Sequence, residues 1–273
     1  MNLDAFDYKE PACPLCSGKE FYDYDPAAQQ GSIPVAQIIA KIDGALNRED
    51  YGEAKRILYY WLAEAKQLRD LRGQLAVYSE LMGLHRKNGE EDEALAAAQN
   101  GLQIIEALGV GHLVSTATVF INAATVYKTF DRAQQALPLY EKAEKIYKEN
   151  LNETDALFGA LYNNMGLALA DLDRREDALA SFEKALKVMT VSPERAPEAA
   201  ITCLNIADLF FGDDEKADEL IQRAYALLSE PAVKHDSYYA FVCKKCAPAF
   251  GAHGYFLMAK ELETKAEKIY AGA

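Results

Sequence analysis

Residues 162–186 read YNNMGLALADLDRREDALASFEKAL, and this stretch decides the fold. Its polar centre, residues 171–174 (DLDR), predicts a turn between two helices rich in alanine and leucine. The asparagine Asn164 has counterparts at Asn122 and Asn205, which lie 42 and 41 residues away along the chain. Similarity at such a fixed spacing is typical of a helical solenoid, in which each unit buries its apolar face against its neighbours.

Small residues mark the point where the two helices of a unit approach each other closely. Alanines recur at this point with gaps of 40, 42, 42, 39 and 42 residues: Ala54, Ala94, Ala136, Ala178, Ala217 and Ala259. Polar turns are expected between the paired helices at residues 47–52, 87–90, 171–174 and 212–214. The pattern therefore predicts an all-α chain of about six helix–turn–helix units. A long amphipathic helical bundle is the structural alternative.

These units resemble the tetratricopeptide repeat, in its longer form of about 42 residues that occurs in kinesin light chains and many bacterial sensors. The residues that fall on the family's pattern are Asn164, Met165, Gly166, Leu169, Ala178, Phe182 and Ala185. The resemblance covers residues 34–273 and is strongest in the third and fourth units. It implies a right-handed superhelical solenoid that acts as a non-catalytic scaffold and binds a protein or an extended peptide in its concave groove.

Composition narrows the classes of partner. The chain has 273 residues, half of them hydrophobic, and a net charge of −13. Phosphate binding needs a basic surface, so nucleic acid is not expected as a partner. No apolar stretch reaches the roughly 18 residues of a membrane helix, and the N-terminus lacks the pattern of a secretory signal. A cytoplasmic location without membrane contact is therefore expected.

The resemblance also implies which residues face the groove, because the sixth pattern position of each first helix points into it. That series is Ala40, Glu80, Asn122, Asn164, Asn205 and Lys245. Neighbouring candidates are Asn163, Thr125, Lys128, Asp208 and Lys244. An asparagine amide can satisfy both the N–H and the C=O of a peptide backbone, although it can also simply bridge adjacent helices. Acidic residues such as Glu80 and Asp208 favour a partner with some positive charge.

Two CxxC pairs form the second motif: Cys13 with Cys16, and Cys243 with Cys246. The first pair lies in residues 1–32, a separate tail whose composition differs from that of residues 33–273. The sequence around this pair resembles a zinc knuckle. Together the pairs supply the four thiolates of a structural zinc site, which would tie the tail to the last unit. The alternatives are a redox pair, or plain packing of buried cysteines. Pro248 predicts an interruption of the last unit, and His235 or His253 could replace a ligand.

No catalytic motif is present: the sequence lacks a phosphate-binding glycine loop, an HExxH pair and a GxSxG elbow. Two functional hypotheses therefore remain. The first is a peptide-binding scaffold, and the second is a metal- or redox-responsive regulator in which the cysteine pairs join the tail to the solenoid. Homodimerisation through an exposed face of the last unit is a further hypothesis.

Overall fold

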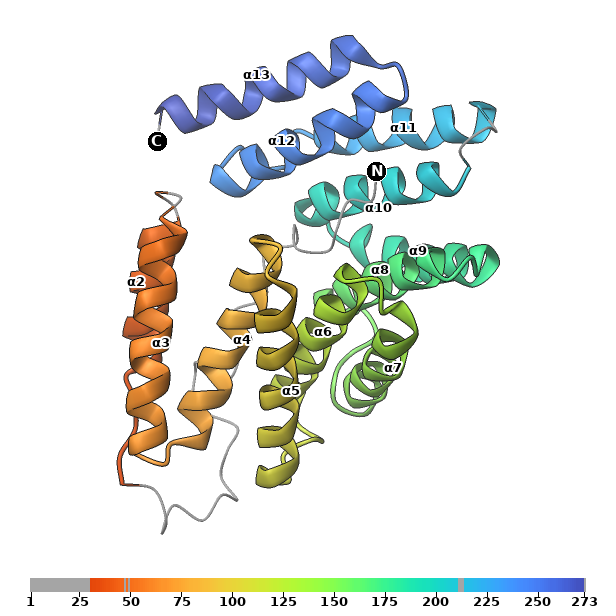
Figure 1. Ribbon diagram of the computed structural model, residues 1–273. Helices are drawn as coiled ribbons and strands as arrows, with labels where there is room; N and C mark the ends of the chain where they lie inside the picture. Colours follow the sequence, from red (N-terminus) through yellow and green to blue (C-terminus); the bar gives the residue numbers. More distant parts are fainter. Residues whose placement is uncertain (1–29, 47, 49, 211–213, 273) are drawn as a thin grey trace. The chain divides into compact units, whose positions relative to one another are not determined.

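The computed structural model describes residues 30–46, 48, 50–210 and 214–272 (Figure 1). Every regular element in these ranges is helical, which confirms the all-α class. The helices are α2 (Val35–Leu46), α3 (Tyr51–Gln67), α4 (Leu71–Lys87), α5 (Glu91–Leu108), α6 (Val114–Thr129), α7 (Ala133–Asn150), α8 (Ala156–Asp171), α9 (Arg175–Met189), η3 (Pro193–Arg195), α10 (Ala196–Leu209), α11 (Asp214–Leu228), α12 (Ser237–Ala252) and α13 (Phe256–Gly272). None of these helices is both long enough and apolar enough to cross a membrane.

The helices pack as consecutive hairpins, and this arrangement confirms a repeat solenoid. The pairs are α2 with α3, α4 with α5, α6 with α7, α8 with α9, α10 with α11, and α12 with α13. The predicted turns fall between the two helices of a pair: α4 ends at Lys87 and α5 begins at Glu91, while α8 ends at Asp171 and α9 begins at Arg175. The spacing of small residues in the sequence therefore corresponds to six hairpins.

A shared turn geometry closes several hairpins. The residue that follows the first helix by two positions has a left-handed backbone: Gly89 (φ 70°), Asp131 (φ 58°), Asp173 (φ 59°) and Gly254 (φ 85°). The next N–H then bonds to a carbonyl five residues back, as when Arg132 N donates to the Tyr127 carbonyl at 2.9 Å. This pattern satisfies carbonyls that the end of a helix would leave unpaired. Aspartate tolerates the left-handed region better than most residues other than glycine.

Close contact between the helices of a pair depends on small residues. Five of the six expected alanines are buried, with exposed fractions of 5% or less: Ala54, Ala94, Ala136, Ala178 and Ala217. Ala259, in the sixth hairpin, is half-buried. Gly166 shows the limiting case, because a Cβ atom built there would lie 2.5 Å from the ring of Phe182. The backbone of α8 therefore rests directly on an aromatic ring of α9.

The chain divides into two compact units, each described by itself. The N-terminal unit holds α2 to α7, and the C-terminal unit holds α8 to α13. Within the N-terminal unit the first helices of successive hairpins lie side by side, α2 against α4 and α4 against α6. The C-terminal unit repeats this arrangement with α8 against α10 and α10 against α12. Each unit therefore has a layer made of first helices, and this layer carries the predicted groove residues.

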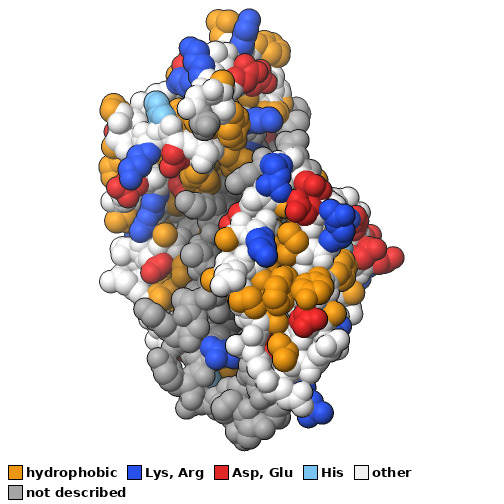
Figure 2. Space-filling model, turned by 90° about the vertical axis from the view of Figure 1, so that its left-hand side faces the viewer, with side chains coloured by type: hydrophobic (Ala, Val, Ile, Leu, Met, Phe, Trp, Pro, Cys, Tyr) orange, Lys and Arg blue, Asp and Glu red, His pale blue; other side chains and the backbone are white. Residues whose placement is uncertain are grey.

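Exposed aromatic side chains gather on the first hairpin. Figure 2 views the molecule from the side on which α2 and α3 lie, and hydrophobic side chains form a group on that face. Three tyrosines of α3 are exposed by 39% (Tyr51), 46% (Tyr59) and 58% (Tyr60). Exposed hydrophobic residues are ordinary on protein surfaces, so the exposure of these three tyrosines does not by itself indicate a binding site.

Candidate functional site: polar side chains on the first helices

In the N-terminal unit, Asn122 bridges two first helices. Its Nδ2 donates to the Oγ atom of Ser79, so α6 and α4 are joined by a hydrogen bond of 3.0 Å. Thr125 is buried one turn further along α6, where its hydroxyl donates to the Ile121 carbonyl at 2.8 Å and lies 3.0 Å from the Tyr140 hydroxyl. These bonds tie both predicted groove residues to the interior of the unit.

The C-terminal unit carries a tighter amide cluster, centred on Asn163. The Oδ1 atom of Asn163 on α8 accepts hydrogen bonds from Asn205 Nδ2 at 3.0 Å and from the Thr202 hydroxyl at 3.1 Å, both on α10. The exposed fractions of Asn163, Asn164 and Asn205 are 0%, 5% and 3%. The sequence identified these asparagines but missed Thr202, which lies one helical turn before Asn205. We call these three hydrogen-bonded residues, together with Asn164, the next residue of α8, the amide cluster.

Three polar atoms of the amide cluster are unpaired. Among the described residues, Asn163 Nδ2, Asn164 Oδ1 and Asn205 Oδ1 have no hydrogen-bond partner, although each is buried. About nine in ten buried polar groups in proteins do have a partner, so unpaired amide atoms on two adjacent helices, α8 and α10, are unusual. The set consists of one donor and two acceptors, which is the chemistry that complements the N–H and C=O groups of a peptide backbone.

Two acidic residues lie on α10 on either side of the amide cluster. Glu198 accepts a hydrogen bond of 2.9 Å from the hydroxyl of Tyr238 on α12, and burial raises the pKa of its carboxyl group. Asp208 Oδ1 lies 3.1 Å from Nε2 of His253. Asp208 was predicted from the sequence, whereas Glu198 was not. Glu198 could have been predicted from its position two helical turns before Asn205, because residues seven apart lie on one side of a helix.

The remaining predicted groove residues are placed less closely together. Lys128 is buried on α6, whereas Ala40 on α2 and Lys244 on α12 are exposed. Glu80 on α4 and Lys245 on α12 are half-buried. Of the predicted groove residues, the structure therefore joins Asn163 and Asn205 by a hydrogen bond, while Asn164 is buried next to Asn163 on α8.

The second cysteine pair lies in the interior of the last hairpin. Cys243 and Cys246 are fully buried on α12, and burial raises the pKa of both thiols. A zinc ligand must be a thiolate, so this environment favours the packing interpretation. The described residues contain no group of three or more histidine, cysteine or acidic side chains that could hold a metal ion. Cys13 and Cys16 lie outside the described residues, and the shared zinc site therefore stays a prediction.

The structure tests one further expectation about this hairpin and places the two histidines named as possible ligands. Helix α12 runs unbroken from Ser237 to Ala252 through Pro248, so the expected interruption is wrong. The cause is that proline removes one N–H donor from a helix that is otherwise held by packing on both of its neighbours, α10 and α13. His253 is paired with Asp208, and the ring of His235 stacks on Tyr239 with centroids 4.3 Å apart.

Successive helical hairpins with small residues at each contact define a helical-repeat protein, a class that generally binds other proteins. The sequence profile of the tetratricopeptide repeat family matches residues 73–149 and 157–230, which is more than half of the chain. The chain therefore belongs to the tetratricopeptide repeat family. The sequence matches no curated protein.

Solved structures with a similar fold are repeat proteins as well. One is a kinesin light chain protein of Podosopora anserina with nearly identical TPR-like repeats, which is 19% identical, covers 73% of this chain and 96% of its own, and has a TM-score of 0.52. Another is the apo form of RapI, which is 13% identical, covers 88% of this chain and 98% of its own, and has a TM-score of 0.51. At such low identity these likenesses show the fold alone.

Proposed function

We propose that this chain is a non-catalytic scaffold that binds an extended peptide on the first-helix layer of its C-terminal unit, α8, α10 and α12. The observation that carries the proposal is the amide cluster with its three unpaired polar atoms. A buried polar atom without a partner costs about 1–3 kcal/mol, and a bound backbone would remove that cost at Asn164 and Asn205, which keep exposed fractions of 5% and 3%. Because every residue has the same backbone groups, such binding depends little on the peptide's sequence.

The peptide's preferred charge follows from the residues around the cluster. Glu198 and Asp208 lie on the same helix as Asn205, and the chain as a whole carries a net charge of −13. A basic residue in the peptide would meet the Asp208 carboxylate near the end of α10 and would be attracted over a longer range by the net charge. We therefore propose a protein partner that presents a segment with at least one lysine or arginine.

The experiment selects short peptides from a random display library against the full chain and measures their affinity by fluorescence anisotropy. Asn164→Ala and Asn205→Ala are each expected to weaken binding about tenfold, since each removes one backbone hydrogen bond. Asn100→Ala is the matched control, because this asparagine lies on α5 in the other unit and its Nδ2 donates to the Ala96 carbonyl of its own helix. Selected peptides that bind equally well to wild type and to the two cluster variants would refute the proposed site.

A further inference from the structure

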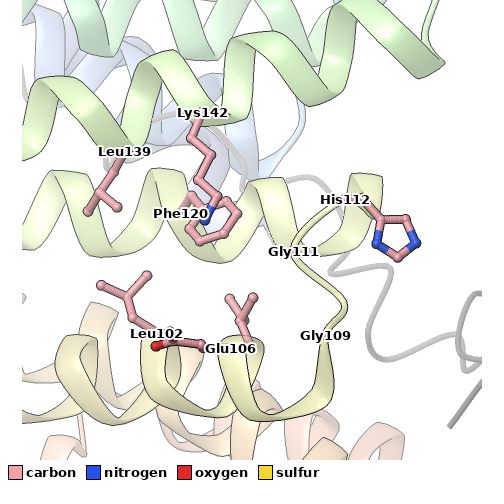
Figure 3. A pocket seen from close by; sticks show the side chains of 9 residues that line it. Leu102, Glu106, Gly109, Gly111, His112, Phe120, Leu139 and Lys142 are labelled. Atoms are coloured by element: carbon pink, nitrogen blue, oxygen red, sulfur yellow. The ribbon is translucent and has the colours of Figure 1, made fainter.

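A pocket of about 590 Å³ opens between α5 and α7 in the N-terminal unit (Figure 3). Phe120 of α6 lies at its centre, and Leu102 and Ile105 of α5 and Leu139 of α7 supply apolar walls. Its volume lies within the range of about 300–1,000 Å³ that is usual for small-molecule sites, which are mostly apolar with a few polar groups. The pocket is separate from the amide cluster, since it lies in the other unit and on second helices of the hairpins.

The loop between α5 and α6 leaves one side of the pocket open, because the glycines in this loop have no side chains. Gly109 has a left-handed backbone (φ 66°) that ends α5, which favours glycine there. A Cβ atom at Gly111 would lie 3.7 Å from Ile105 Cγ2 and 3.9 Å from both Phe120 Cζ and Lys142 Nζ. Position 111 therefore faces the interior of the pocket, and a Cβ atom there would make ordinary van der Waals contacts with its lining.

One positive and one negative side chain line the pocket on different helices. Lys142 of α7 places its Nζ 4.3 Å from the centre of the Phe120 ring, while Glu106 belongs to the opposite wall on α5. His112, which follows Gly111 in the loop between α5 and α6, lines the pocket as well. The lining thus offers the exposed side chains of Lys142, Glu106 and His112 around the buried ring of Phe120.

We propose that this pocket binds a small apolar zwitterion, a molecule with one carboxylate, one ammonium group and an aliphatic or aromatic body. The carboxylate would pair with Lys142, the ammonium group with Glu106, and the apolar body would contact Leu102 and Leu139, which are half-buried. A ligand with a single charge would make only one of these two charge-assisted contacts. Free apolar amino acids and dipeptides share this chemistry, and the experiment below distinguishes the two.

Calorimetric titration of the full chain uses four probes of similar shape: leucine, leucyl-leucine, isocaproate and isoamylamine. Isocaproate lacks the ammonium group of leucine, and isoamylamine lacks its carboxylate. Leucine or leucyl-leucine is expected to bind, and the tighter of the two identifies the ligand size. Each singly charged probe is expected to bind at least about tenfold more weakly, because it loses one charge-assisted contact. Equal binding of all four probes, or no binding up to millimolar concentration, would overturn the proposal.

Three variants test the site itself. Gly111→Leu is expected to abolish binding by filling the pocket, and Lys142→Met and Glu106→Gln are each expected to weaken it about tenfold. Lys145→Met is the matched control, because Lys145 is an exposed lysine of α7 that pairs with Glu149 at 3.9 Å and does not line the pocket. Thermal unfolding checks that each variant is folded. If Gly111→Leu fails to fold, the two charge variants decide, and wild-type affinity in both would refute the site.

Discussion

At the scale of single residues, the contact between Gly166 and Phe182 explains why a small residue recurs at this point of the repeat. A methyl group at position 166 would lie 2.5 Å from the ring, which is too close for two carbon atoms, so one helix must shift. We expect Gly166→Ala to lower the free energy of unfolding by about 1–3 kcal/mol, as over-packed cores do. Urea denaturation followed by circular dichroism measures this change.

The control for this substitution is Gly83→Ala. Gly83 also lies inside a helix, α4, but no atom lies within 4 Å of the Cβ position. Alanine has a higher helix propensity than glycine by about 1 kcal/mol, so this variant should be as stable as wild type or slightly more stable. If both substitutions stabilise the chain, the close approach of α8 to Phe182 is not a real constraint.

Glu198 carries a second prediction at this scale. Burial raises its pKa above the ordinary value, so the folded chain favours the protonated carboxyl more than the unfolded chain does. The stabilisation from this group is complete below the unfolded pKa and is lost as pH rises through the folded pKa. Glu198→Gln keeps an acceptor for the Tyr238 hydroxyl, and we expect it to stabilise the chain at pH 7 but not at pH 4. Urea midpoints at the two pH values check this, and an equal effect at both would contradict it.

At the scale of helices and turns, the left-handed residues that close the hairpins can be compared directly. Asp173 adopts φ 59° at the position where Gly89 adopts φ 70° in another hairpin. A residue with a Cβ atom is destabilised by roughly 1–2 kcal/mol in this backbone conformation. Glycine avoids that cost, but it loses more conformational entropy on folding, which offsets part of the gain. We expect Asp173→Gly to stabilise the chain by about 0.5–1 kcal/mol and Gly89→Ala to destabilise it by about 1 kcal/mol. Thermal unfolding of both variants measures this, and changes of the same sign would contradict it.

The periodicity of the sequence was sufficient to predict the helices, because each hairpin repeats the same local pattern: a small residue at the helix contact and a polar turn between the helices. It was not sufficient for the polar contacts between hairpins. Asn163 rather than Asn164 accepts the bonds from α10, and this depends on how far adjacent first helices are rotated about their axes. The pocket was missed for a similar reason, since its lining comes from two hairpins and from a glycine loop whose direction no local pattern specifies.

The buried cysteines yield a prediction about helices α10 and α12. Cys203, Cys243 and Cys246 are fully buried, and burial raises the pKa of the Cys203 thiol to about 11. Thiolate is the reactive form, so these three thiols should react slowly with Ellman's reagent at pH 8 and rapidly after unfolding. If they serve only in packing, a metal chelator should not change the rate. Faster reaction after chelation, together with about one zinc per chain by elemental analysis, would instead support the shared site with Cys13 and Cys16.

At the scale of the whole molecule, the two proposed sites lie in different compact units and can be tested independently. The amide cluster belongs to α8 and α10, while the zwitterion pocket belongs to α5, α6 and α7. A substitution such as Gly111→Leu should therefore leave peptide affinity unchanged unless the two units are energetically coupled. Any change in peptide affinity on addition of the zwitterion would measure that coupling as a free energy.

The last hairpin carries the prediction about assembly. Phe256 and Leu257 of α13 are exposed by 71% and 86%, and Tyr270 near the end of the same helix by 45%. In a stacked-repeat protein each hairpin buries its apolar face on the next one, so exposed apolar residues on α13 are suited to contact with a second copy of the chain. We expect light scattering to show a dimer whose population rises with concentration. Leu257→Glu should then give a monomer, because it would place a charge in the apolar contact.

The matched control for Leu257→Glu is Val191→Glu, since Val191 is also exposed, by 57%, but lies between α9 and η3 rather than on α13. This variant should dimerise like wild type if the contact is made by α13. A wild-type chain that stays monomeric at every concentration would refute the dimer outright. Loss of the dimer in both variants would point to the added charge on an already acidic chain, with its net charge of −13, as the cause instead of the α13 surface.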